Sequence, residues 1–127
     1  MIKIAKNNTI LIKEENNQKI VNIKFANTFF SRFKGLMFKK DLNHALVLKP
    51  NKTLSKSTSI HTCFMRIAID IIFLDENKRV FEIATLKPWK FYTPKKGASY
   101  ILEMKEASIE KYKIAIGDKL DFVCELR

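Results

Sequence analysis

The sequence predicts an α+β fold: a single compact domain of mostly antiparallel, barrel-like β-sheet with two short helices. Three observations carry this prediction. The chain has 127 residues, which suits one domain and hardly two. Its apolar residues fall in short alternating segments separated by turn residues. Only two stretches place apolar residues at the three- and four-residue spacing of a helix.

The N-terminal segment predicts a hairpin followed by a strand. Residues 2–4 and 10–12 alternate apolar and polar side chains on either side of Asn7-Asn8, a pair that tolerates turn geometry. Residues 14–19 are polar and predict a loop. Residues 20–25 predict a strand with alternate apolar side chains on one face.

A helix is expected next, with Asn27 or Thr28 as its cap. Gly35 within it costs about 1 kcal/mol relative to alanine, so either the helix ends there or another group approaches the backbone closely. The apolar residues at helical spacing are Phe29, Phe30, Phe33, Leu36 and Met37.

The middle of the chain gives the strongest structural signal. Residues 45–48 predict a short buried strand that Pro50 ends, and the Ser/Thr-rich residues 51–59 predict a loop. Residues 69–74 and 80–84 predict a β-hairpin around a tight turn at 75–78, buried on both faces at its start.

The C-terminal third predicts two more strands and the second helix. Ala107 or Ser108 begins one or two helical turns, with Ile109 and Tyr112 facing inward. The other expected elements are a Pro/Gly-punctuated crossover over residues 91–97, a strand over 98–104, a turn at Gly117-Asp118 and a final strand over 120–126.

The net charge of +11 favours anionic partners such as phosphates, acidic proteins or lipid headgroups. Twenty of the 24 cations are lysines scattered along the chain, and only Lys39-Lys40 and Lys95-Lys96 are adjacent. Specific recognition of bases would require more arginine. We favour a solvated basic surface over specific nucleic-acid binding, and a coding bias toward lysine, asparagine and isoleucine would raise the charge without any partner.

Nothing in the sequence predicts a membrane span or an export signal. Apolar runs such as residues 71–74 are far shorter than the ~20 residues that cross a bilayer. Residues 1–4 contain no continuous apolar stretch. We therefore expect a cytoplasmic protein whose two cysteines, Cys63 and Cys124, are free thiols.

A metal site is the sharpest alternative for the segment around Cys63. If the segment is extended, His61, Cys63 and Met65 point to one face at ~6.5–7 Å spacing and form the soft ligand set that copper prefers. A closed zinc site would need His44 and Cys124 to converge there as well, without the usual short ligand spacing. We expect a packed strand, no metal and no cofactor.

Arg66 and Asp70 interrupt an apolar stretch, so each lies either at a strand end or in an internal pair. An unpaired buried carboxylate costs several kcal/mol, so Asp70 needs an arginine or backbone N–H groups around it. We favour a structural role, in which Asp70 pins a loop through backbone hydrogen bonds. The functional alternative is that Arg66 and Asp70 line an anion- or sugar-accepting pocket.

Several motifs together resemble one known family. They are Gly35-Leu36-Met37-Phe38, His61-Thr62-Cys63-Phe64-Met65-Arg66, Ile69-Asp70-Ile71-Ile72-Phe73-Leu74-Asp75, Leu86-Lys87-Pro88-Trp89, Gly97-Ala98, Leu102-Glu103 and Gly117-Asp118. The sequence resembles the domain of unknown function 192 family, also called uncharacterised protein family 0127 (UPF0127). The His-Thr-x-Phe-Met-Arg variant is similar to that of its archaeal-type, cytosolic members.

The resemblance covers about residues 21–124 and leaves residues 1–20 as an N-terminal hairpin extension of the single domain 1–127. It implies a β-rich α+β fold and no established activity. The family-pattern positions it implies are Gly35, Met37, Met65, Asp70, Asp75 and Glu103. Ala68 stands where the family often has proline, and Ala107-Ser108 stands where it often has glycine. These departures concern loop geometry and not the fold.

The leading functional hypothesis is a non-catalytic domain that binds a small molecule or a protein partner. Its cleft would use methionines as an apolar wall and charged residues for orientation. The proposed binding residues are Gly35, Met37, Met65, Arg66, Asp70 and Trp89.

An enzyme is the first alternative. A hydrolase would use Asp70 with Glu103 or Asp75 as an acid–base pair, which requires two carboxylates ~5–9.5 Å apart in one cavity. The sequence has no phosphate-binding glycine loop, no G-x-S-x-G and no H-E-x-x-H. We therefore assign no catalytic residues.

Non-specific nucleic-acid binding is the second alternative. It predicts that four lysines of the crossover region gather with two aromatic residues on one face. These residues are Lys87, Lys90, Lys95, Lys96, Trp89 and Tyr92.

Overall fold

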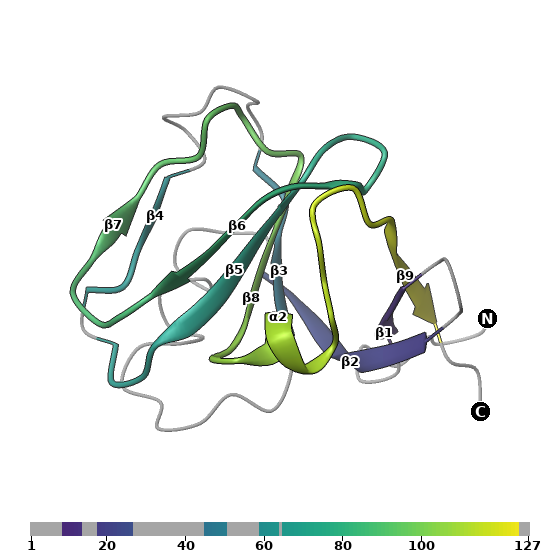
Figure 1. The fold of residues 1–127 in the computed structure, drawn as a ribbon, viewed down its shortest axis with the longest axis horizontal. Helices are drawn as coiled ribbons and strands as arrows, with labels where there is room; N and C mark the ends of the chain where they lie inside the picture. The colour runs from purple at the N-terminus through teal and green to yellow at the C-terminus, as the bar shows by residue number, and fades with distance from the viewer. Residues whose placement is uncertain (1–8, 14–17, 27–44, 51–58, 64, 125–127) are drawn as a thin grey trace.

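A computed structural model describes residues 9–13, 18–26, 45–50, 59–63 and 65–124. In this part of the chain, seven strands form one sheet in the order β6-β5-β8-β3-β2-β1-β9, and β4 pairs with β7 in a separate ribbon (Figure 1). The described pairs are antiparallel except for β2 with β3. The elements are β1 (Thr9–Lys13), β2 (Gln18–Ala26), β3 (Ala45–Leu48), β4 (Ile60–His61), β5 (Ile69–Leu74), β6 (Val80–Leu86), β7 (Phe91–Tyr92), β8 (Tyr100–Lys105), α2 (Ser108–Lys111) and β9 (Leu120–Cys124).

The strands predicted from alternation are confirmed where they fall on described residues; the one over residues 2–4 lies outside them, and the segment over 10–12 is β1, which pairs with β2. The strands expected over residues 20–25 and 45–48 are β2 and β3, and the buried hairpin is β5 with β6. Its turn is fixed by Asp75, whose carboxylate accepts the amide hydrogens of Asn77 and Arg79 at 2.8 and 3.0 Å. The helical turn expected after Ala107 is α2, and β8 and β9 lie in the two predicted C-terminal strands.

The expected barrel is not confirmed. The sheet order runs openly from β6 to β9, and the described strands form no closed barrel. The two ends are joined by an isolated bridge between Arg79 and Lys119, where the Val80 amide donates to the Asp118 carbonyl at 2.9 Å and the Leu120 amide donates to the Lys78 carbonyl at 3.0 Å. Of the two expected helices, the described residues contain α2. The other, over residues 27–37, lies outside them, as do the turn at residues 7–8 and the loop over 51–58.

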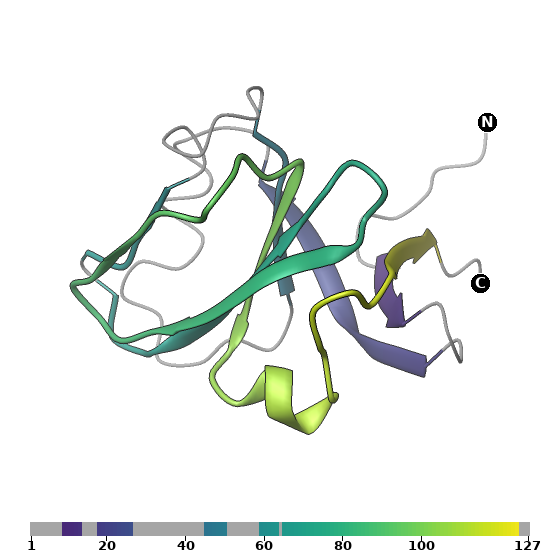
Figure 2. The same ribbon diagram turned by 45° about the horizontal axis from the view of Figure 1, so that its top comes forward.

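Strand β5 is buried along its whole length because the chain covers both faces of the sheet. We name the two resulting hydrophobic clusters after the element that lies over each. The ribbon-side core contains Leu46, Leu48, Ile60, Met65, Ile69, Ile71, Phe73, Leu86, Ala98 and Ile101. The helix-side core contains Ile20, Ala45, Val47, Ile72, Leu74, Val80, Leu102, Met104, Ile114 and Leu120. Figure 2 shows α2 and the β4–β7 ribbon at separate places around β5 and β6.

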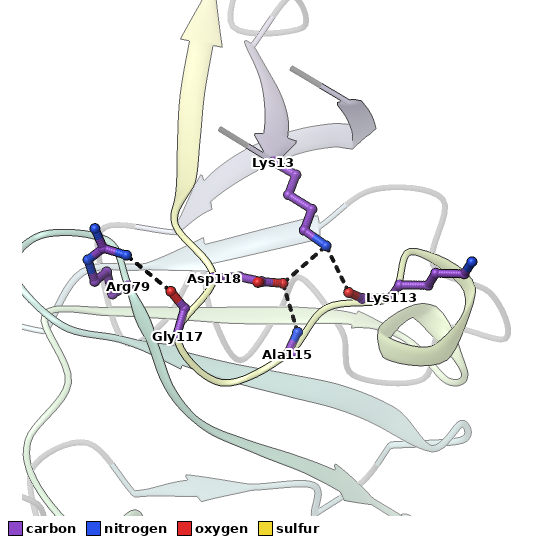
Figure 3. A network of polar contacts seen from close by, with 6 residues as sticks. All are labelled: Lys13, Arg79, Lys113, Ala115, Gly117 and Asp118. Atoms are coloured by element: carbon purple, nitrogen blue, oxygen red, sulfur yellow. Dashed lines mark hydrogen bonds and ion pairs between the residues drawn. The ribbon is translucent and has the colours of Figure 1, made fainter. Parts of the chain in front are cut away.

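The loop before β9 is fixed by the Gly117-Asp118 turn. Gly117 has a φ of 96°, a conformation that favours glycine. The Asp118 carboxylate accepts the Ala115 amide hydrogen at 2.9 Å and forms an ion pair with Lys13 at 3.2 Å (Figure 3). Lys13 also donates to the Lys113 carbonyl at 3.0 Å. The last residue of β1 therefore holds this loop, and β1 itself lies between β2 and β9 in the sheet.

A buried carboxylate holds the crossover segment onto the ribbon-side core. Glu82 lies opposite Phe73 in the β5–β6 ladder and is buried. It accepts a hydrogen bond from the Tyr92 hydroxyl and another from the Lys95 amide at 2.9 Å. The Tyr92 ring stacks on Phe73 with 5.7 Å between centroids. The hydrogen bond to Glu82, with burial and the nearby negative charge, raises the pKa of Tyr92 to about 12.

This raised pKa predicts a loss of stability at high pH. The folded state holds the Tyr92 proton more tightly than the unfolded chain, where the pKa is 10.0. The stabilisation is therefore complete below pH 10 and is lost as the pH rises toward about 12. Urea unfolding of wild type and Tyr92→Phe across this range should show a steeper decline for wild type. Parallel declines would mean that the hydroxyl does not carry this effect.

Candidate functional site

The predicted binding residues that the structure describes differ in burial and in location. Met65 is buried in the ribbon-side core, and Asp70 is 1% exposed. Arg66 is exposed, and among the described side chains it forms no ion pair with Asp70. Trp89 is 59% exposed. Gly35 and Met37 lie outside the described residues.

Asp70 holds the start of α2 from a neighbouring strand. The cap residue of α2, Ala107, has a φ of 73° and no side chain that can accept a hydrogen bond. The Asp70 carboxylate instead accepts the Ile109 amide hydrogen at 2.8 Å, and its other oxygen accepts the Thr85 hydroxyl at 2.8 Å. A negative charge at this position also suits the helix start. The expectation that Asp70 pins a loop through a backbone hydrogen bond is confirmed.

An open depression of about 490 Å³ lies over this contact. The buried Asp70 forms its floor, and exposed Glu106 and Glu110 stand on its rim. The other lining residues are Ile83, Ala84, Thr85, Ala107 and Ile109. Both Asp70 oxygens are occupied by protein donors, so the depression has a structural carboxylate at its base.

The carboxylate pairs required by the hydrolase alternative do not form. Asp70 is opposite Met104 in the β5–β8 ladder, and Ile71 is opposite Glu103. Residues opposite each other share a face and neighbours alternate, so Asp70 faces the helix-side core and Glu103 the ribbon-side core. Asp75 lies in the turn, five residues after Asp70, which corresponds to roughly 16 Å along an extended strand. Neither partner can share a cavity with Asp70, and both proposed pairs are wrong.

The same alternation separates two of the predicted binding residues. Met65 packs in the ribbon-side core, whereas Asp70 lies on the other side of the sheet. They therefore do not line one cleft. The expectation that His61, Cys63 and Met65 share one face of a strand is also wrong, because β4 ends at His61 and the Met65 amide turns back to the Thr62 carbonyl at 3.2 Å.

Cys63 is a free thiol, as expected. Within the described ranges, no three His, Cys, Asp or Glu side chains gather in a way that could hold a metal ion. In the same ranges, no helix is long and apolar enough to cross a membrane.

Thr62 is the residue that organises this region, and sequence reasoning missed it. It is fully buried, and its hydroxyl donates to the Lys87 carbonyl at 2.6 Å and accepts the Lys90 amide hydrogen at 2.8 Å. Its backbone amide donates to the Lys90 carbonyl, and its carbonyl accepts the Trp89 amide hydrogen, both at 2.9 Å. Thr62 follows Ser57, Thr58, Ser59 and His61, so no local signal in the sequence set it apart.

Residues 87–91, which we call the aromatic turn, are fixed by Thr62 and carry two exposed aromatic side chains. Trp89 is 59% exposed and Phe91 is 76% exposed. Lys87 and Lys90 are exposed beside them. The turn leads into β7, and Figure 1 shows the β4–β7 ribbon on the opposite side of the molecule from β1 and β9. Phe91 was not among the predicted residues, because nothing in the sequence says which residue of Phe91-Tyr92 faces outward.

The residue set predicted for nucleic-acid binding is brought together only in part. Lys87, Lys90, Lys95 and Lys96 are all exposed. Tyr92, however, points inward onto Phe73 and Glu82, so its placement on this face is wrong. Lys96 lies over the Phe81 ring, 4.7 Å from its centroid.

Comparison with known proteins settles the family. A family model, DUF192, described as "Uncharacterized ACR", matches residues 10–122. The chain belongs to the DUF192 family. A UPF0127 protein of Pyrococcus furiosus is 42% identical over 102 residues, covering 80% of this chain and 87% of that protein. One from Thermococcus sibiricus is 43% identical over 104 residues, covering 81% and 67%. The resemblance found in the sequence is confirmed, and the match begins inside the segment assigned to the N-terminal extension.

Two solved structures share the DUF192 fold of this chain. One, from Sinorhizobium meliloti, is named "putative transcription regulator"; it has a TM-score of 0.78 at 16% identity, over 96% of this chain and 97% of that one. The other, a protein of unknown function from Novosphingobium aromaticivorans, has a TM-score of 0.72 at 20% identity, over 89% and 82%. At these identities the likeness concerns the fold alone.

The role of Asp70 is tested by removing its acceptors. Asp70→Ala leaves the Ile109 amide and the Thr85 hydroxyl without their buried partner, and should lower the free energy of unfolding by about 2–4 kcal/mol. Asp70→Asn keeps one acceptor oxygen and should cost less. Urea unfolding measures both. Glu110→Ala, on the rim of the same depression, is the matched control and should cost under about 0.5 kcal/mol. An equal effect of the alanine variants at 70 and 110 would rule out the capping role.

The role of Thr62 is tested by an isosteric change. Thr62→Val removes the hydroxyl that holds Lys87 and Lys90, and should cost about 1–3 kcal/mol in unfolding free energy. Amide exchange at Lys90 should become faster. The control is Thr93→Val, which removes an exposed hydroxyl bonded to Ser59 at 2.8 Å and should cost much less. Unchanged protection at Lys90 in Thr62→Val would contradict the assignment.

Proposed function

We propose that this DUF192 chain is a non-catalytic binding domain whose binding face is the aromatic turn together with Arg66. The Met65 amide and the Trp89 amide both donate to the Thr62 carbonyl, which brings the segment ending in Arg66 next to the turn. Two large rings and three cations are therefore displayed on a fixed backbone. Recognition surfaces favour this combination of rigid aromatic residues and basic side chains.

The observation that carries the proposal is the backbone conformation of Trp89. Its φ is 64°, in the left-handed region that costs a bulky residue about 1–2 kcal/mol. Glycine or asparagine would occupy this position at lower cost. Trp89 keeps this conformation while more than half of its surface is exposed to solvent. We infer that its side chain contributes to binding.

Two of the remaining predicted binding residues are not part of this exposed face. Met65 packs in the ribbon-side core, and Asp70 holds α2 on the other side of the sheet. Gly35 and Met37 remain predicted parts of the wall of this site.

Nucleic-acid binding is the second candidate function. It is favoured by the four exposed lysines of residues 87–96 and by the absence of any acidic residue between them. The name of the Sinorhizobium structure points the same way. The small number of arginines favours contacts to phosphates over the recognition of bases.

The proposed face is tested by a fragment screen. Small aromatic carboxylates and aromatic phosphates, titrated into the labelled protein, should shift the NMR signals of residues 61–66 and 87–92. Trp89→Gly should abolish these shifts while leaving the free energy of unfolding within about 1 kcal/mol of wild type, because glycine accepts the left-handed conformation. Ile116→Ala, which trims another exposed apolar side chain, is the control. Shifts that avoid both segments, or that survive in Trp89→Gly, would overturn the proposal.

A further inference from the structure

The two rings of the aromatic turn stand out from the protein surface. A side chain that is 76% exposed, as Phe91 is, has most of its ring in water, and Trp89 is exposed to 59%. Tyr92, the next aromatic residue, is turned inward and bonded to Glu82. The turn therefore presents two exposed rings that can enter an apolar phase, and the half-buried His61 ring lies 6.2 Å from that of Phe91, measured between centroids.

Positive charge surrounds these rings. Residues 87–99 contain four lysines and no acidic residue, and Lys87, Lys90, Lys95 and Lys96 are all exposed. Arg66 adds a fifth exposed cation next to the turn. The carboxylate beneath this segment, Glu82, is buried and bonded to Tyr92 and Lys95. The long-range field of the whole chain, with a net charge of +11, has the same sign.

The backbone that carries the rings is already fixed. Thr62 bonds to the backbone at Lys87, Trp89 and Lys90, so contact with a partner orders little additional chain. A fixed turn with exposed aromatic residues and flanking lysines suits an interface between water and hydrocarbon. Aromatic rings settle there at headgroup depth, while lysines reach the anionic headgroups.

We propose that the aromatic turn docks this domain peripherally onto a membrane surface that contains anionic lipids. This inference rests on the proposed function and names the partner of that face. Trp89 and Phe91 enter the boundary between headgroups and acyl chains, and Lys87, Lys90 and Arg66 contact headgroup phosphates. Single-stranded nucleic acid has the same charge, but its binding relies on successive rings along a cationic groove. The inward placement of Tyr92 favours the membrane.

Trp89 is the only tryptophan of the chain, so its fluorescence reports on this face directly. The full chain is titrated with phosphatidylcholine vesicles, with and without about one-third phosphatidylglycerol. The expected result is a blue-shifted emission, protection from acrylamide and co-sedimentation with the anionic vesicles only. Binding should weaken as salt is raised, because counterions screen the lysines. Unshifted emission in the presence of anionic vesicles overturns the proposal.

Variants separate local docking from general attraction by charge. Phe91→Ala with Trp89→Gly should weaken co-sedimentation about tenfold or more, and Lys87→Gln and Lys90→Gln about fivefold each. The matched controls, Ile116→Ala and Lys111→Gln, remove an exposed apolar side chain and an exposed lysine elsewhere and should change little. Equal losses in the test and control variants would overturn the proposal, because binding would then follow net charge alone.

A titration with oligothymidylate distinguishes single-stranded nucleic acid from a membrane as the partner of this face. In one outcome, the oligonucleotide quenches Trp89 fluorescence without a blue shift while the protein fails to bind anionic vesicles. That result overturns the membrane proposal in favour of nucleic acid, and the binding face itself is still supported. If the protein binds neither the anionic vesicles nor the oligonucleotide, only the membrane proposal is overturned, because the fragment screen tests the binding face independently. Binding to anionic vesicles with a blue shift, together with loss in the aromatic variants, supports the proposal.

Discussion

Strand β5 is buried on both faces, and this constraint shapes the rest of the domain. A strand of this kind must be covered twice, and in the described part of the chain the one helix has four residues. The covers that lie within the described ranges are short irregular segments: α2 with its flanking loops on one face, and the β4–β7 ribbon with the crossover segment on the other. Such segments bring backbone polar groups close to the core, where each needs a hydrogen-bond partner.

Three buried polar side chains supply partners for these covers. Asp70 bonds to the Ile109 amide and fixes α2 over the helix-side core. Glu82 bonds to Tyr92 and to the Lys95 amide, and fixes the crossover segment over the ribbon-side core. Thr62 bonds to the backbone of the aromatic turn. Asp70, Glu82 and Thr62 thus stabilise the segments that cover the sheet.

The β5–β6 hairpin and its Asp75 turn were predictable, because alternation and turn chemistry act locally. The structural role of Asp70 was predictable from the cost of burying a carboxylate. Its partner Ile109, 39 residues away, was not, because that contact depends on how the sheet is ordered. The separation of Asp70 from Glu103 depends on the β5–β8 register, which no local pattern contains. The extended form expected for His61 to Met65 failed because the Thr62 carbonyl accepts the Met65 amide and turns the chain.

The Thr62 contacts also explain how a strained tryptophan is tolerated. They reach the backbone of Lys87, Trp89 and Lys90. At position 89 the contact is a backbone amide that donates to the Thr62 carbonyl, and any residue except proline could donate it. The two family-like motifs around Thr62 and Pro88 therefore act together: one supplies the hydroxyl, and the other supplies the turn that it holds. Because the contact at position 89 uses the backbone, a glycine there can keep the turn, and the proposal requires that Trp89→Gly weaken binding more than it weakens the fold.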